Sequence, residues 1–79
     1  MNPRITKVDT LQDYKLLLEF ANGESKMFDM NKYLDFGVFK ELRDVNYFNK
    51  VKVGHGSIYW PHEQDLCPDT LYLDSIKIY

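Results

Sequence analysis

The stretch Tyr14-Lys15-Leu16-Leu17-Leu18-Glu19-Phe20, followed closely by Asn22-Gly23, decides the fold. Apolar side chains recur at every second position from Tyr14 to Phe20, and this period of two predicts a β-strand with one apolar face. Asn22-Gly23 is the strongest short signal for a type I′ turn, which needs positive φ at both central residues. The sequence therefore predicts a β-hairpin that reverses at this dipeptide.

A two-residue turn at Asn22-Gly23 fixes the register of the hairpin. The resulting pairs are Phe20–Ser25, Glu19–Lys26, Leu18–Met27 and Leu17–Phe28. Glu19 and Lys26 then place opposite charges on the same face of the sheet. Leu17 and Phe28 fall on that second face as well, so we expect something to cover it.

Further short elements are predicted on both sides of this hairpin. They are a first strand over residues 5–8, short helices over 30–34 and 38–43, a turn of helix after Asp44, strands over 51–53 and 58–60, a helix from Pro68, and a last strand or loose tail over 76–79. Asp29, Asp44 and Pro68 suit the starts of their helices. With His55-Gly56 as the second turn, Val53 pairs with Ile58, Lys52 with Tyr59 and Val51 with Trp60. We predict one α+β domain over residues 1–79, a small and mostly antiparallel sheet of four to five strands with short helices packed on it.

The composition limits the classes of function that we expect for this protein. The chain has 79 residues, 44% of them hydrophobic, and a formal net charge of −2. Lysine and arginine form no run, which argues against direct contact with nucleic acid, because such contact needs clustered positive charge. The single cysteine gives no disulfide framework, and no apolar stretch is long enough for a membrane span or signal peptide. We expect a cytoplasmic protein that binds neither nucleic acid nor membrane.

Candidate chemistry is sparse. His62, Asp65 and Cys67 lie close in sequence, and such a set could form a nucleophilic site. A lone cysteine before a proline at a helix start is more often a cap or a small buried residue. Only His55, His62 and Cys67 are soft metal ligands, and they lack the spacing of a metal site. We therefore predict no catalytic residues, no metal and no cofactor, and we interpret the chain as a non-enzyme.

Aromatic residues offer a better clue to binding. Trp60-Pro61 with Asp65 and Pro68-Asp69 is the most distinctive stretch, and tryptophan and tyrosine dominate interface hot spots. The competing interpretation places Trp60 in the core beside Val51. Six tyrosines are more than one small core needs, and Tyr59 is predicted on the face opposite Trp60. The predicted binding residues are Tyr59, Trp60, Asp65, Asp69 and Tyr72.

Several motifs together resemble a bacterial family known as domain of unknown function 2442. The matching stretches are Tyr14-x-Leu16-x-Leu18-x-Phe20-x-Asn22-Gly23-Glu24, Phe28-Asp29, Tyr33-Leu34, Gly37-Val38-Phe39 with Leu42 and Asp44, and Trp60-Pro61-x3-Asp65-x2-Pro68-Asp69-x-Leu71-Tyr72. The resemblance implies a small α+β fold and a setting beside a second small protein, in arrangements similar to toxin–antitoxin pairs. It brings no catalytic residue set.

Three hypotheses follow. The first is a protein-interaction module, an antitoxin-like or accessory partner of another small protein that could be encoded next to it, with a homo-oligomer as a further option. The second is a small-molecule-binding regulatory domain with a cleft near Trp60, Asp65 and Tyr72. The third is a minor enzyme that uses His62 and Cys67.

Overall fold

The structure is a computed structural model that describes residues 2–78. Its strands are β1 (Ile5–Leu11), β2 (Lys15–Phe20), β3 (Ser25–Asp29), β4 (Lys52–Gly54), β5 (Ser57–Tyr59) and β6 (Ile76–Lys77). Its helices are the 3₁₀ helices η1 (Gln12–Tyr14), η2 (Asn31–Tyr33) and η3 (Gly37–Arg43) and the α-helices α1 (Val45–Phe48) and α2 (Pro68–Asp74).

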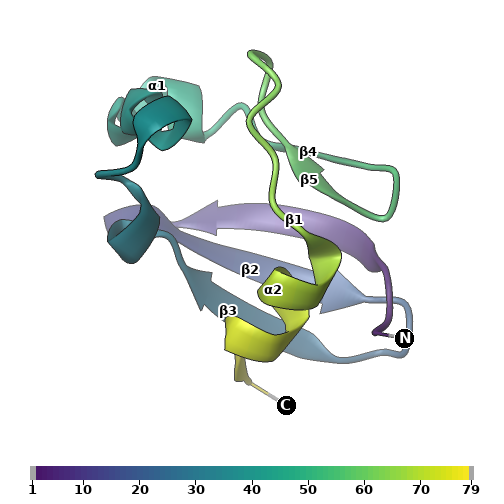
Figure 1. Ribbon diagram of the computed structural model, residues 1–79. Coiled ribbons are helices and arrows are strands. Elements are labelled where there is room, and N and C mark those ends of the chain that lie inside the picture. Colours follow the sequence, from purple (N-terminus) through teal and green to yellow (C-terminus); the bar gives the residue numbers. More distant parts are fainter. Residues whose placement is uncertain (1, 79) are drawn as a thin grey trace.

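The strands form two antiparallel sheets. One sheet has the order β1-β2-β3-β6, and the other is the β4–β5 hairpin. Helix α2 lies against one face of the larger sheet, while the hairpin and α1 lie above β1 (Figure 1). The predicted α+β class, with mostly antiparallel strands and short helices, is confirmed.

The first hairpin turns differently from the prediction. The N–H of Phe20 donates to the C=O of Glu24 (2.9 Å), and the N–H of Gly23 donates to the C=O of Phe20 (3.0 Å), so the loop holds three residues. Of these, only Gly23 has positive φ, at 89°. This is the loop in which a left-handed glycine follows a type I turn. The predicted two-residue type I′ turn is therefore wrong.

The longer loop shifts the strand register by one residue. The observed pairs are Glu19–Ser25, Leu18–Lys26, Leu17–Met27 and Leu16–Phe28. The reason is that Phe28 is fully buried and must share a face with Leu16 and Leu18. The predicted register would have turned Phe28 to the opposite face. The expected Glu19–Lys26 pair does not form, and Glu19 lies 3.9 Å from the ammonium of Lys7 instead.

The second hairpin follows its prediction. His55 and Gly56 both have positive φ, at 54° and 78°, as a type I′ turn requires. Val53 lies opposite Ile58, and Lys52 lies opposite Tyr59. Ile58 on this hairpin is buried in the core, so the apolar face of the hairpin is turned inward. The core residues are Ile5, Leu16, Leu18, Phe20, Phe28, Met30, Leu34, Leu42, Tyr47, Phe48, Ile58, Trp60 and Leu71.

The helices are held by caps as well as by packing. The carboxylate of Asp44 accepts from the N–H of Asn46 (3.0 Å) at the start of α1, and Pro68 occupies the start of α2. Asp29 accepts from the N–H of Asn31 (2.9 Å) at the start of η2. This backbone hydrogen bond lowers the pKa of Asp29. The predicted helix starts at Asp44 and Pro68 are thus confirmed, whereas the N-cap residue of η2 is Met30 and not Asp29.

Tyr72 fastens α2 to the sheet. Its ring packs edge-on against Phe20 with centroids 5.0 Å apart, and its hydroxyl donates to the carboxylate of Glu24. The ammonium of Lys26 donates to the C=O of Tyr72 (2.6 Å) and lies 3.7 Å from its ring centroid. The hydrogen bond between the side chains lowers the pKa of Glu24 and raises that of Tyr72. The observed register makes this possible, because it turns Glu24 and Lys26 toward α2.

Within residues 2–78, no helix has the length and apolar character that a membrane crossing requires.

Neighbouring side chains on β3 test the register. Phe28→Ala should lower the free energy of unfolding by about 3–5 kcal/mol, because it opens a cavity in the core. Met27→Ala is the matched control on the other face, and it should cost about 1 kcal/mol or less. Urea denaturation measures both values. Equal costs would contradict the observed register.

Candidate functional site

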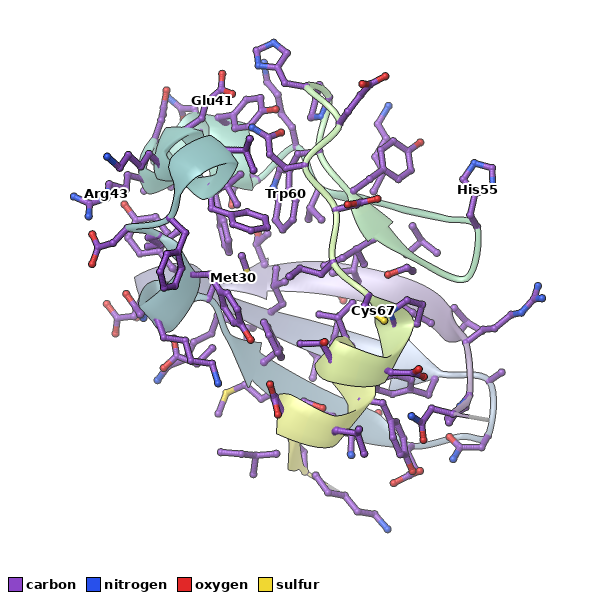
Figure 2. All side chains as sticks on the ribbon, in the orientation of Figure 1. Met30, Glu41, Arg43, His55, Trp60 and Cys67 are labelled. Atoms are coloured by element: carbon purple, nitrogen blue, oxygen red, sulfur yellow. The ribbon has the colours of Figure 1, made fainter. Side chains whose placement is uncertain are left out.

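A groove of about 420 Å³ lies between the β4–β5 hairpin and the segment over residues 65–68. It is lined by Gly54, His55, Ser57, Ile58, Tyr59, Asp65, Leu66, Cys67 and Pro68. An adjoining hollow of about 380 Å³ shares His55, Tyr59 and Asp65 with it and adds Glu63. Because the two share three residues, we treat them as one surface and call it the Tyr59 groove. Figure 2 shows its two walls, with His55 at the hairpin tip and Cys67 where α2 begins.

Tyr59 presents its ring in this groove. The side chain is 37% exposed, and the ring lies directly over Gly54. A Cβ atom at Gly54 would come within 2.6 Å of Cε1 of Tyr59, so any other residue there would displace the ring. Because Gly54 has no side chain, it leaves the space that this exposed aromatic ring occupies.

The loop over residues 60–64 forms the rim of the groove. The N–H of Trp60 donates to the C=O of Gln64, and the N–H of Glu63 donates to the C=O of Trp60, both at 2.9 Å. This pattern repeats that of the first hairpin loop, with Glu63 at the position of Gly23. Glu63 has a φ of 70°. A non-glycine residue in this region carries a strain of about 1–2 kcal/mol.

A polar network holds the rim from below. The buried amide of Gln64 accepts from the hydroxyl of Tyr47 (2.7 Å) and donates to Glu41 (2.9 Å) and to the C=O of Val38 (3.1 Å). The N–H of His62 donates to the Tyr47 hydroxyl (2.8 Å), and its ring nitrogen Nδ1 lies 2.7 Å from Glu41. The hydrogen bonds from His62 and then Gln64 lower the pKa of Glu41. The rim is therefore tied to η3 and α1.

The groove has an acidic edge. Among residues 2–78, none forms a side-chain hydrogen bond or an ion pair with the carboxylates of Glu63 and Asp65. The backbone of Asp65 bridges to that of Tyr59, which brings this carboxylate beside the ring. The remaining lining includes the apolar residues Ile58, Leu66 and Pro68. The surface thus combines an exposed aromatic ring with two carboxylates that the described chain leaves without a cation.

The structure brings together only part of the predicted binding set. Tyr59 and Asp65 line the groove. Trp60 is fully buried, and its indole N–H donates to the C=O of Phe48 (2.9 Å), so it belongs to the core. Asp69 lies in the first turn of α2 and accepts from the amide of Asn2 (3.0 Å), and Tyr72 is the anchor described above. Because Trp60 is fully buried, it does not line a surface cleft together with Asp65 and Tyr72.

His62 and Cys67 are not brought together as a nucleophilic pair. Cys67 is exposed and lines the groove, whereas the ring of His62 is bound to Glu41 and does not line it. In the described part of the chain, no group of three or more His, Cys, Asp or Glu residues could hold a metal ion.

Sequence reasoning missed Gly54, His55 and Glu63 as parts of this site. Gly54 carried a usable signal, because a glycine at a strand end often permits close approach of another group. Glu63 carried none, because glutamate has no preference for the left-handed conformation it adopts here.

Strain at Glu63 predicts a stabilising substitution. Glu63→Gly should raise the free energy of unfolding by about 1 kcal/mol, because glycine adopts this φ without a Cβ clash. Glu63→Ala removes the same carboxylate but keeps the Cβ atom, and it should bring no such gain. Thermal and urea unfolding of the two variants decide the matter. An Ala variant as stable as the Gly variant would show that the loop is not strained.

Low pH should weaken the stabilising contribution of Glu41 to the rim. Because the pKa of Glu41 is lowered from 4.5 in the folded state, its contribution to stability is complete above about pH 4.5 and is lost as the pH falls through its folded value. The stability difference between the wild type and Glu41→Gln should therefore shrink between pH 4.5 and pH 3. Urea unfolding at several pH values measures it. A difference that stays constant down to pH 3 would contradict this role.

Comparison with known families gives a match over most of the chain. The family described as protein of unknown function (DUF2442) matches residues 5–77. Comparison with curated proteins and with solved structures finds no match. The matched range contains the whole Tyr59 groove and both hairpins. Since it covers nearly the full length of the sequence, the chain belongs to the DUF2442 family.

Proposed function

We propose that this protein is a non-enzymatic protein-binding module, an accessory or antitoxin-like partner of another small protein encoded next to it. Its Tyr59 groove takes a short, extended segment of that partner that carries lysine or arginine. The observation that carries the proposal is the exposed ring of Tyr59. This ring packs over Gly54, and it shares a surface hollow with Glu63 and Asp65.

Charge and shape favour a basic segment. A lysine or arginine side chain can lie over the face of Tyr59 and be attracted by its ring. The same cation can pair with Asp65 or Glu63, whose carboxylates have no cationic partner in the described chain. The apolar groove floor at Ile58 and Leu66 suits the methylene stem of such a side chain. Tyrosine within a partly desolvated pocket is also typical of interface hot spots.

The same site is a poor fit to the other two hypotheses. An open groove with an acidic edge lacks the enclosure that small-molecule sites provide. The nucleophilic alternative needs His62 within reach of Cys67, and His62 is bound to Glu41 instead. A protein segment uses the features that are present, namely an aromatic ring, an acidic edge and an open course along the hairpin.

Copurification with the protein encoded by the adjacent gene tests the proposal, and calorimetry measures the affinity. Tyr59→Ala should weaken binding roughly tenfold or more, as expected for a hot-spot tyrosine. Asp65→Asn should weaken it several-fold and flatten its dependence on salt, because it removes a charge at the edge of the interface. Lys52→Glu, which adds an acid opposite Tyr59, should strengthen it.

Phe36→Ala is the matched control for loss of an exposed aromatic side chain. Phe36 is 63% exposed and does not line the groove, so this variant should bind like the wild type. An interaction that survives both Tyr59→Ala and Asp65→Asn would place the partner elsewhere. A monomer that ignores the neighbouring protein altogether would overturn the proposal.

A further inference from the structure

A pocket separate from the Tyr59 groove lies where β1 ends, between η1 and α1. Its volume is about 380 Å³, and it is lined by Leu11, Gln12, Asp13, Tyr14, Val45, Phe48 and Asn49. We call it the Tyr14 pocket. Figure 1 shows this end of β1 beneath α1, on the side away from the tip of the β4–β5 hairpin. The Tyr14 pocket shares no lining residue with the Tyr59 groove, so it is a site of its own.

The wall that η1 forms has an unusual backbone. Asp13 and Tyr14 both have a φ of 60°, which is the left-handed region. Aspartate adopts this conformation more readily than most residues, whereas it is exceptional for a residue as bulky as tyrosine. Strained residues persist only where the surrounding structure holds them, and they cluster at sites that clamp ligands. Two of them in succession mark this wall as a candidate binding site.

Hydrogen bonds hold the strained wall in place. The C=O of Tyr14 accepts from the N–H of Met30 (3.0 Å), and the Tyr14 hydroxyl donates to the C=O of Arg43. The C=O of Asp13 accepts from the side-chain amide of Asn31 (2.6 Å). The wall is therefore fixed before any ligand arrives, and such preorganisation lowers the entropic cost of binding.

The rest of the lining is largely apolar. Phe48 is only 2% exposed and packs edge-on against the ring of Tyr14, with centroids 5.4 Å apart, so the two rings form the floor. Leu11 and Val45 are 39% and 56% exposed, and both line the same pocket. Small-molecule sites have this character, with volumes of about 300–1,000 Å³, apolar and aromatic walls and a few polar groups. The pocket therefore suits a small hydrocarbon or aromatic group.

Asp13 gives the pocket its charge. Among residues 2–78, none forms a hydrogen bond or an ion pair with the Asp13 carboxylate. The lining contains no lysine, arginine or histidine, and its other polar side chains are the amides of Gln12 and Asn49. A ligand that carries a positive charge beside an apolar body is therefore complementary to this pocket.

We propose that the Tyr14 pocket binds a small organic cation, an ammonium group carried on a short aromatic or branched hydrocarbon body. The body lies against Leu11, Val45 and Phe48, and the ammonium pairs with Asp13. Removal of apolar surface from water supplies most of the affinity, and the carboxylate sets the preference for a cation. This binding goes beyond the proposed function and does not depend on it.

Titration with 2-phenylethylammonium tests the proposal, with the amide resonances of the ¹⁵N-labelled protein as the readout. The probe should shift the amides of residues 11–14 and 45–49 in a saturable way, with a dissociation constant in the millimolar range or below, as expected for a ligand of so few atoms. Its neutral analogue 2-phenylethanol should bind several-fold more weakly, because it forms no ion pair. Ethylammonium, which lacks the ring, should give no saturable shifts.

Asp13→Asn separates the charge from the shape of the pocket. Asparagine has nearly the same volume and also tolerates the left-handed conformation, so the fold is kept. The variant should bind 2-phenylethylammonium several-fold more weakly and 2-phenylethanol as before. Leu11→Ala should weaken both probes by a similar factor, because it removes apolar contact. Asp9→Asn is the matched control, an acid of β1 that does not line the pocket, and it should change neither affinity.

Three results would overturn the proposal. One is the absence of saturable shifts at residues 11–14 and 45–49, and another is equal binding of the charged and the neutral probe. The third is a set of shifts confined to residues 54–59 and 63–68, which would place the probe in the Tyr59 groove. The partner experiments above use different variants and a different ligand, so the failure of one proposal leaves the other standing.

Discussion

Burial of Phe28 on the same face as Leu16 and Leu18 is the constraint on which the rest of the structure depends. A strand has two faces, and a loop of even or odd length decides which residues of the returning strand share the face of the first. The three-residue loop before Glu24 places Phe28 in the core. The cost of a non-ideal turn is small beside the loss of a buried phenylalanine.

The same register determines the position of one wall of the groove through a series of contacts. It turns Lys26 and Glu24 toward α2, where both bind Tyr72. Tyr72 holds α2 on the sheet, and α2 begins at Pro68, on one wall of the groove. The other wall is the β4–β5 hairpin, which follows its own turn at His55-Gly56. The candidate site is therefore a product of two hairpins whose turns have different lengths.

The sequence predicted the class of fold, the second hairpin and the helix starts at Asp44 and Pro68, because each rests on short-range chemistry. The prediction of the first turn was wrong because Asn22-Gly23 suits a two-residue turn and a three-residue loop alike. Only the burial of Phe28 shows which of the two turns forms. Of the predicted binding residues, Tyr59 and Asp65 meet at the groove. Trp60 does not, since distinctive sequence cannot distinguish an interface indole from a core one. Glu63 gave no signal because its role comes from backbone geometry.

Nuclear Overhauser contacts between α-protons across β2 and β3 test the register most directly. In the observed register, Leu17–Met27 and Glu19–Ser25 are non-hydrogen-bonded pairs, whose α-carbons approach most closely. Strong contacts between the α-protons of these two pairs are the predicted result. Strong contacts for Leu18–Met27 and Phe20–Ser25 would instead demonstrate a two-residue turn, and would contradict the burial of Phe28 and the anchoring of α2 that follows from it.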